Sequence, residues 1–534
     1  MRYVYSLPGN TLQKRSTHYF WKTRKSVYFS VLQYSILTIL FFIISSCATA
    51  PETRVEEIDR DDEPVAVELI PDPGDPESLP PQEELEPRTL IPLGELTIPP
   101  LPEREPAFID ELLNNHKARA LPTPDEAVIP FVGRPVPRTE LTAREQREAV
   151  IRQIVSSMTP EQLIGQLFMP SLPIAPAGGG SVDYNRRVAA LIEEVQPGGV
   201  ILFAHNLRTP EQVRSLVEDL QRHSDVPLLI SVDQEGGLVS RLTSNPTMGA
   251  TVIPSAQAVG RTEDTELAYK VARVIARELR ALGITMNFAP VADILTNPQN
   301  RVIGNRAYSS DPATVARMVS ATVRGMQDEG VSAVIKHFPG HGDTREDTHF
   351  QAAIVPHSLE RLREVEFLPF RAGIAAETDG VMTAHVTVPA VGGVALPATL
   401  SPEVIEDLLR QELDFSRLVV TDSLVMAAVT EYFPEDLIPL RAFQAGADVL
   451  LQPRNPAAAR RVMLRALEDG TITRGQLERS VRRVLRVKFD RGLMLEDPQG
   501  QELFLRPARF TPPEGMYAYG IPEHRELMER VTPR

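Results

Sequence analysis

The sequence predicts an α/β fold, a single (β/α)8 TIM-like barrel, and three observations support this prediction. After residue 142, eight short apolar runs rich in β-branched residues alternate with amphipathic helical patterns. Each run is mostly apolar and continuous rather than alternating, which is typical of parallel strands that are buried on both faces. Roughly 350 residues hold all eight units, a length that suits one closed barrel better than an open doubly wound sheet.

The predicted strands and helices follow one another in regular order. The eight predicted strands are Ile164–Met169, Gly199–Phe203, Leu228–Val232, Thr285–Ala289, Ala333–Ile335, Gly380–Ala384, Leu418–Thr421 and Asp448–Leu451. Helices are predicted between most of them, for example at Pro210–His223, Glu263–Leu282, Pro312–Gly330, Ser358–Glu377 and Pro402–Glu412. We expect the barrel to span residues 142–496.

The N-terminal segment predicts export and attachment to a membrane. Residues 1–25 carry six basic residues and no acidic one, and residues 26–46 form an uncharged run of 21 residues, which is long enough to cross a bilayer. Cys47, the only cysteine, follows Ile44-Ser-Ser in a sequence that resembles the lipid-attachment motif of bacterial lipoproteins. Residues 1–47 are therefore interpreted as a signal peptide with lipidation at Cys47, or alternatively as an uncleaved membrane anchor.

Residues 48–141 are predicted to be a disordered linker. They are rich in proline, and residues 52–105 carry 17 acidic residues against four basic ones. Such a composition offers too few apolar groups to offset the entropy of folding, and its prolines favour an extended chain. We expect a spacer between membrane and barrel, with an acidic binding tail as the alternative.

Composition excludes several classes of partner and site. The net charge of −15 lies mostly in the linker, and no basic face is apparent for a nucleic-acid partner. A single cysteine excludes disulfides within the chain and cysteine-rich metal sites.

Polar residues follow the predicted strands at their carboxyl ends, where barrel enzymes build their active sites. One such residue could be purely structural, but five strands share the pattern. The residues are Asp233, Asp293, Lys336 with His337, His385 and Asp422.

The segment 334–349, VIKHFPGHGDTREDTH, is the most unusual part of the sequence. Its three histidines could suggest zinc, but Pro339 and the glycines after it prevent a helix that would place His337 and His341 on one face. In the alternative interpretation, Lys336 and His337 bind substrate, and the glycine-rich loop carries Asp347 and His349. A carboxylate near a histidine can raise its proton affinity, which makes a general acid at neutral pH. A solvated loop with incidental polar residues also stays open.

Four motifs resemble the β-N-acetylhexosaminidase branch of glycoside hydrolase family 3. They are KHFPGHGDTREDTH from Lys336, DQEGGLVSRL from Asp233, NRVIGNRAYSSDP from Asn300 and VTDSLVM from Val420. The resemblance runs from about residue 158 to 493. It implies a retaining hydrolase with Asp422 as nucleophile, an Asp347–His349 pair as acid/base, and no metal or cofactor. The sugar-binding residues that it implies are Asp233, Arg241, Arg306, Lys336 and His337.

The chemistry of these residue types agrees with the resemblance. Asp422 has to be ionised to attack, and we expect Lys336 and the nearby arginines to keep it so. Two features depart from the family pattern: Leu238 stands where many relatives have arginine, and residues 497–534 are too short for the second sandwich domain of many members.

The sequence therefore predicts an exported, membrane-tethered exo-β-N-acetylglucosaminidase whose substrates are peptidoglycan fragments or chitooligosaccharides. Two alternatives stay open. One is another activity on the same barrel, either a β-glucosidase or a phosphorylase, since a histidine acid/base does not repel phosphate. The other is a non-catalytic glycan-binding lipoprotein.

Overall fold

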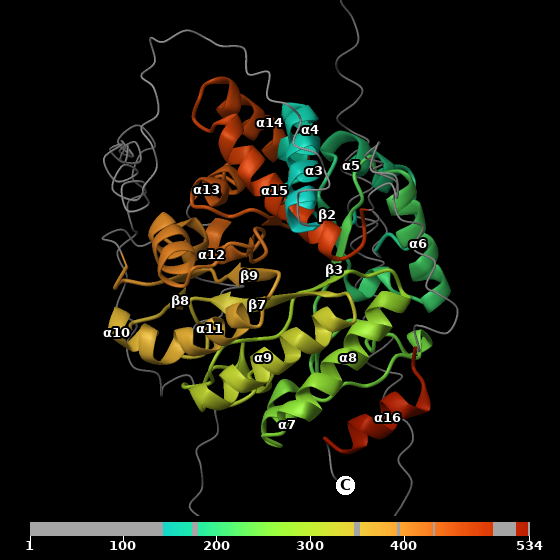
Figure 1. The fold of residues 1–534 in the computed structure, drawn as a ribbon, viewed down its shortest axis with the longest axis vertical. Coiled ribbons are helices and arrows are strands. Elements are labelled where there is room, and N and C mark those ends of the chain that lie inside the picture. The colour runs from blue at the N-terminus through green and yellow to red at the C-terminus, as the bar shows by residue number, and fades with distance from the viewer. Residues whose placement is uncertain are drawn as a thin grey trace, which may run out of the picture. The chain divides into compact units, whose positions relative to one another are not determined.

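The computed structural model describes residues 143–173, 180–345, 353–391, 396–430, 433–494 and 519–531. Its largest sheet has six parallel strands in the order β11-β9-β7-β6-β3-β2, and β1 pairs with β12. Parallel bridges from Ser171 to Ile201 and from Val420 to Val449 join these two groups. The pairing therefore runs round a closed barrel, surrounded by helices (Figure 1). The predicted α/β barrel is confirmed.

All eight predicted strands contribute to this ring. Their bounds are β1 Phe168–Met169, β2 Gly199–Ile201, β3 Leu229–Val232, β6 Met286–Asn287, β7 Ser332–Phe338, β9 Gly380–Thr383, β11 Leu418–Thr421 and β12 Leu450–Leu451. Shorter strands outside the ring are β4 Gln234–Gly236, β5 Val239–Ser240, β8 Ala353–Ile354 and β10 Val386–Thr387. The first part of the predicted strand Ile164–Met169 was wrong, because Thr159 caps a short helix, α4, that runs through Gly165.

Several helices begin at capping residues that the sequence displays. Asp264 caps α8 and Asp311 caps α9, in each case by accepting a hydrogen bond from a backbone N–H of the first turn. The larger helices are α3 Ala143–Ser157, α4 Pro160–Gly165, α5 Arg186–Val195, α6 Pro210–Arg222, α8 Thr265–Ala281, α9 Pro312–Asp328, α11 Phe367–Ala375, α13 Ile438–Gln444, α14 Pro456–Glu468 and α15 Arg474–Asp490. Shorter ones are α7 Ala256–Gly260, α10 Leu359–Arg361 and α12 Ala427–Thr430. The stretches Leu362–Glu366 and Glu403–Glu412 are π-helical.

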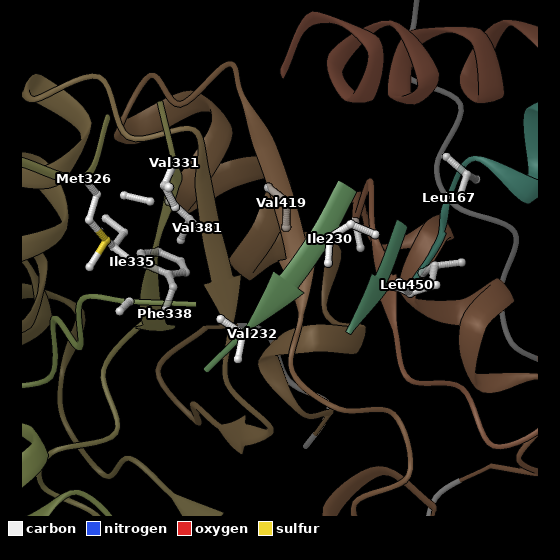
Figure 2. Close-up of a cluster of buried hydrophobic side chains, with 14 of the residues drawn as sticks. Leu167, Ile230, Val232, Met326, Val331, Ile335, Phe338, Val381, Val419 and Leu450 are labelled. Carbon is white, nitrogen blue, oxygen red and sulfur yellow. The ribbon is translucent and has the colours of Figure 1, made fainter. Parts of the chain in front are cut away.

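Adjacent strand residues are divided between two hydrophobic layers. One apolar cluster includes at least one residue from each barrel strand and fills the barrel interior, for example Leu229, Val334 and Met382. Their neighbours in sequence, such as Ile230, Ile335 and Val381 (Figure 2), belong to a second cluster that also includes helix residues, for example Met326 of α9. This alternation explains why the strands are mostly apolar.

A last helix, α16 (Pro522–Glu529), packs against α8 (Figure 1). Met528 and Val531 are buried in the outer hydrophobic layer. In the described part of the chain, no helix has the length and apolarity needed to cross a membrane. The predicted signal or anchor segment and the predicted linker lie outside the described residues.

Candidate active site

The carboxyl ends of three barrel strands bring together the polar residues that the sequence singled out. Asp233 follows β3, Lys336 and His337 lie within β7, and Asp422 follows β11. Strand β7 extends three residues beyond the predicted Ala333–Ile335, so Lys336 and His337 belong to the strand itself. Parallel strands in a barrel end on the same face, and the contacts described next follow from that.

Asp233 is held between two cations. Its Oδ1 lies 2.9 Å from Nζ of Lys336, and its Oδ2 lies 3.3 Å from a terminal nitrogen of Arg241. The Arg241 guanidinium also lies over the ring of Phe203, 5.6 Å from its centroid. The carboxylate is therefore fixed in place, with a partly exposed side chain that can accept further hydrogen bonds.

Glu235, two residues further along, connects Lys336 to Arg306. Its Oε1 lies 2.7 Å from Nζ of Lys336, and its two oxygens accept a bidentate pair of hydrogen bonds from Arg306, each of 2.9 Å. Burial tends to raise the pKa of Glu235, but the charges of Lys336 and Arg306 outweigh it and lower the pKa to about 2. Burial lowers the pKa of Lys336, but the carboxylates of Asp233 and Glu235 outweigh this effect, so the pKa is raised.

The prediction from the sequence did not include Glu235. The signal that could have found it is its spacing: in an extended chain, Glu235 projects on the same side as Asp233, which was predicted to bind sugar. The sequence alone did not indicate whether Asp233 or Glu235 would pair with Arg306.

His337 is oriented by a buried aspartate. Nδ1 of His337 lies 2.6 Å from Oδ2 of Asp293, which is fully buried, and the Nε2 atom lies 3.5 Å from a terminal nitrogen of Arg306. Asp293 also accepts hydrogen bonds from the backbone N–H groups of His337 and His341. Burial favours a raised pKa for Asp293, but the two histidines more than offset it, so its pKa is lowered.

Asp422 follows β11 and lies among groups that lower its pKa. Burial raises its pKa, whereas His385, His337, a hydrogen bond from the N–H of Ser423 (2.7 Å) and Lys336 lower it, and the net pKa is below its ordinary value of 3.8. His385 is held by Thr399 and by the carbonyl of Ser423. Asp422 is thus ionised at neutral pH.

The groups that lower the pKa of Asp422 differ in part from those that we expected. Lys336 contributes as predicted, but the largest favourable contributions come from two histidines. Arg241 pairs with Asp233, and Arg306 pairs with Glu235. The arginines therefore neutralise the carboxylates of the opposite wall.

The predicted acid/base pair, Asp347 and His349, and the predicted lipid-attachment residue Cys47 lie outside the described residues. Two described residues on either side of the acid/base pair contact each other. Oδ2 of Asp343 lies 2.6 Å from Nε2 of His357, and Oδ1 of Asp343 accepts a hydrogen bond from the hydroxyl of Thr296.

Within the described ranges, no three histidine, cysteine or acidic side chains are grouped so that they could hold a metal ion. His337 and His341 direct their Nδ1 atoms to different partners, Asp293 and the Thr344 hydroxyl. The arrangement can instead present carboxylate, ammonium and guanidinium groups to hydroxyls, next to an ionised carboxylate that is suited to nucleophilic attack.

Comparisons with known proteins identify relatives of this chain. The family description "Glycosyl hydrolase family 3 N terminal domain" matches residues 159–487. The chain is 42% identical over 262 residues to a β-hexosaminidase of Stenotrophomonas maltophilia, a match that covers 47% of this chain and 75% of the relative. It is 33% identical over 365 residues to β-hexosaminidase A of Pseudoalteromonas piscicida, covering 62% of this chain and 61% of that protein. The chain thus spans less than two thirds of the latter relative.

A solved structure is also similar. It is a glycoside hydrolase family 3 β-N-acetylglucosaminidase from Paenibacillus sp. strain FPU-7, with a TM-score of 0.63 and 43% sequence identity. The similarity covers 70% of this chain and 68% of that one. The family match includes every described residue of the candidate site.

Proposed function

The chain belongs to glycosyl hydrolase family 3, and on that premise we propose that it is a retaining exo-β-N-acetylglucosaminidase. It removes terminal N-acetylglucosamine from peptidoglycan fragments or chitooligosaccharides. The names of its relatives, two β-hexosaminidases and a β-N-acetylglucosaminidase, support this choice of sugar. The observation that carries the proposal is the carboxylate of Asp422, whose pKa is lowered by His385, His337, the N–H of Ser423 and Lys336.

The sugar is held by the groups on β3 and β7. Asp233 accepts hydrogen bonds from sugar hydroxyls, while Lys336 and Arg306 donate them. Glu235 keeps Lys336 and Arg306 in place, because both cations contact its buried carboxylate. His337 presents Nε2 to the sugar, since Asp293 engages its Nδ1 atom.

The reaction proceeds in two displacements. Asp422 attacks the anomeric carbon while the bond to the leaving oxygen breaks, and His349 gives its proton to that oxygen. The neutral His349 then takes a proton from water, whose oxygen attacks the anomeric carbon and releases Asp422. Asp347 orients the imidazole and raises its proton affinity. Two inversions return the sugar in its original β configuration.

We further propose that the enzyme is exported and tethered to a membrane through Cys47. The support is the basic N-terminal segment, the uncharged run of 21 residues and the position of Cys47 after it. The proline-rich acidic stretch up to residue 141 acts as a spacer that lets the barrel reach its polymeric or fragment substrate.

The test of the proposed function compares two aryl glycosides with and without phosphate. We expect the purified protein to hydrolyse the aryl N-acetyl-β-glucosaminide in preference to the aryl β-glucoside, at a rate that phosphate leaves unchanged. Faster glucoside cleavage would identify a β-glucosidase, and formation of a sugar 1-phosphate would identify a phosphorylase. No turnover of either glycoside would leave glycan binding as the function of the barrel.

A further inference from the structure

Glu278 on α8 is a buried carboxylate at which three segments distant in the sequence meet. Only 2% of the residue is exposed. It accepts hydrogen bonds from the N–H of Thr251 (3.1 Å), the hydroxyl of Thr251 (2.5 Å) and the N–H of Gly520 (3.0 Å), and it lies 3.1 Å from Nδ1 of His524. A carboxylate buried this deeply needs such donors around it. Thr251 and the C-terminal segment are therefore fixed to the same point of α8.

The C-terminal segment, residues 519–531, is packed as well as hydrogen-bonded. Its helix α16 lies against α8 (Figure 1), and its Met528 joins the outer hydrophobic layer. His524 is 3% exposed, so its imidazole is enclosed beside Glu278. The segment thus has a defined position on the barrel.

The segment that contains Thr251 packs against residues 234–240, which lie next to Asp233 in the candidate site. We call residues 249–255 the strap, and β4 with β5 (Gln234–Ser240) the hairpin. The N–H of Gly237 in the hairpin donates to the carbonyl of Ile253 in the strap, at 2.9 Å. Gly236 has a φ of +98°, and a Cβ atom there would lie 2.5 Å from the carbonyl oxygen of Pro254. A Cβ atom at Gly237 would likewise lie 2.9 Å from Cα of Ser255. The two segments are therefore in close contact, so a shift of the strap moves the hairpin.

The hairpin and the residues directly next to it carry groups of the candidate site. Glu235 lies within β4, Asp233 comes directly before it, and Arg241 directly follows β5. Asp422 follows β11; its backbone N–H donates to the carbonyl of Thr383, and its side chain accepts from the N–H of Ser423. A displaced hairpin therefore disturbs the binding of the sugar more than the position of the nucleophile.

We propose that Glu278 is a positioning residue for sugar binding, which couples the C-terminal segment to the hairpin through Thr251 and the strap. The inference rests on the proposed function, since it concerns the same site. Its consequence is that Glu278 and His524, which belong to a region remote from the reacting atoms, determine the affinity for the sugar.

The test compares Glu278→Gln with Glu266→Gln in the full chain. Glu266 lies on the same helix, is exposed and pairs with Lys270, so it controls for the loss of one carboxylate from α8. For the aryl N-acetyl-β-glucosaminide we expect Glu278→Gln to raise KM roughly tenfold and to leave kcat within about twofold, because glutamine replaces one of the two acceptor oxygens with a donor, far from the nucleophile. Glu266→Gln should match the wild type in both constants.

Two further variants keep the test independent of the stability of Glu278→Gln. Thr251→Val removes one hydroxyl donor but retains the carboxylate, and His524→Ala removes the imidazole of the C-terminal segment. We expect each to raise KM about threefold, at a temperature well below every melting transition. A KM within about twofold of the wild type in Glu278→Gln, or in Thr251→Val where Glu278→Gln does not fold, would overturn the proposal even if the melting temperature falls.

A binding measurement separates this inference from the proposed function. Titration of the wild type and Glu278→Gln with free N-acetylglucosamine should give a Kd roughly ten times weaker for the variant. A wild type that binds the sugar but cleaves no glycoside would refute the proposed function and leave the inference standing. Equal Kd values for the two proteins, or no binding by the wild type, would refute the inference.

Discussion

Asp293 holds the imidazole of His337, with Oδ2 of the aspartate 2.6 Å from Nδ1 of the ring. Because the aspartate is ionised, this contact places a proton on Nδ1 and leaves Nε2 to face Arg306 and the sugar. A fully buried residue thereby determines the hydrogen-bonding character of a residue that lines the site.

Replacing Asp293 with asparagine tests this relationship. An asparagine can turn its amide N–H₂ toward Nδ1 and so favour the other tautomer of His337. We expect kcat/KM for the aryl N-acetyl-β-glucosaminide to fall by about one to two orders of magnitude, the effect of losing a hydrogen bond to a charged group. The matched control is Asp311→Asn at the N-cap of α9, where asparagine caps as well as aspartate. Equal losses in the two variants would argue against the orienting role.

The low pKa of Glu235 leads us to expect that the unfolding free energy falls in acid. Its pKa is about 2 in the folded protein, against an ordinary value of 4.5. Because the folded pKa is depressed, ionised Glu235 stabilises the protein above pH 4.5, and this stabilisation is lost as pH falls from 4.5 toward 2. The difference corresponds to about 3 kcal/mol of unfolding free energy.

Denaturant unfolding at several pH values measures this contribution. Across pH 5 to pH 3, the unfolding free energy of the wild type should fall more steeply than that of Glu235→Gln, which carries no titratable group at this position. The variant should also be less stable at pH 7, because Lys336 and Arg306 lose a charged partner. Parallel pH profiles for the two proteins would contradict this assignment.

Gly342 is required by close packing in the turn that follows β7. A Cβ atom at this position would overlap the carbonyl oxygen of Ile294. Gly342→Ala should therefore displace the backbone between His341 and Asp343 and lower the melting temperature. The control is Gly475→Ala in α15, where the nearest atom to a new Cβ is 3.8 Å away and alanine favours the helix. Thermal unfolding of both variants checks the prediction, and an unchanged Gly342→Ala would refute it.

Cys47 tests the proposed tether. When the full chain is expressed in a bacterium that lipidates exported proteins, we expect it in the membrane fraction, and we expect detergent to release it. Cys47→Ala should remove the acyl chains, which mass spectrometry of the N-terminal peptide detects. An intact N-terminal segment in the membrane-bound wild type would instead support the uncleaved anchor.

The eight strands of the barrel were predicted correctly from the sequence, but the residues at which some of them begin and end were not. Continuous, mostly apolar runs such as Leu418–Thr421 are a strong signal because a strand buried on both faces has few polar positions. The run at Ile164 was also mostly apolar, but its first residues belong to a short helix that Thr159 caps. A local pattern cannot distinguish these outcomes when the segment is short.

The candidate site was partly predictable for a similar reason. Asp233, Lys336 and Asp422 stood out because charged residues at the carboxyl ends of buried barrel strands are typical of active sites. The pairing of Glu235 with Arg306 was not predictable, since 71 residues separate them and only the closed barrel brings them together. The coupling through Glu278 was hidden for the same reason: its partners Thr251 and Gly520 lie far away on both sides in the sequence.

The central claim is that Asp422 forms a covalent bond with the sugar. The most direct measurement uses His349→Ala, in which an activated aryl N-acetyl-β-glucosaminide can still glycosylate the enzyme, while hydrolysis of the intermediate lacks its general base. After acid quenching, peptide mass mapping should find an N-acetylglucosaminyl group on Asp422. A sugar attached to another residue, or rapid release of the aryl group with no adduct, would contradict the account.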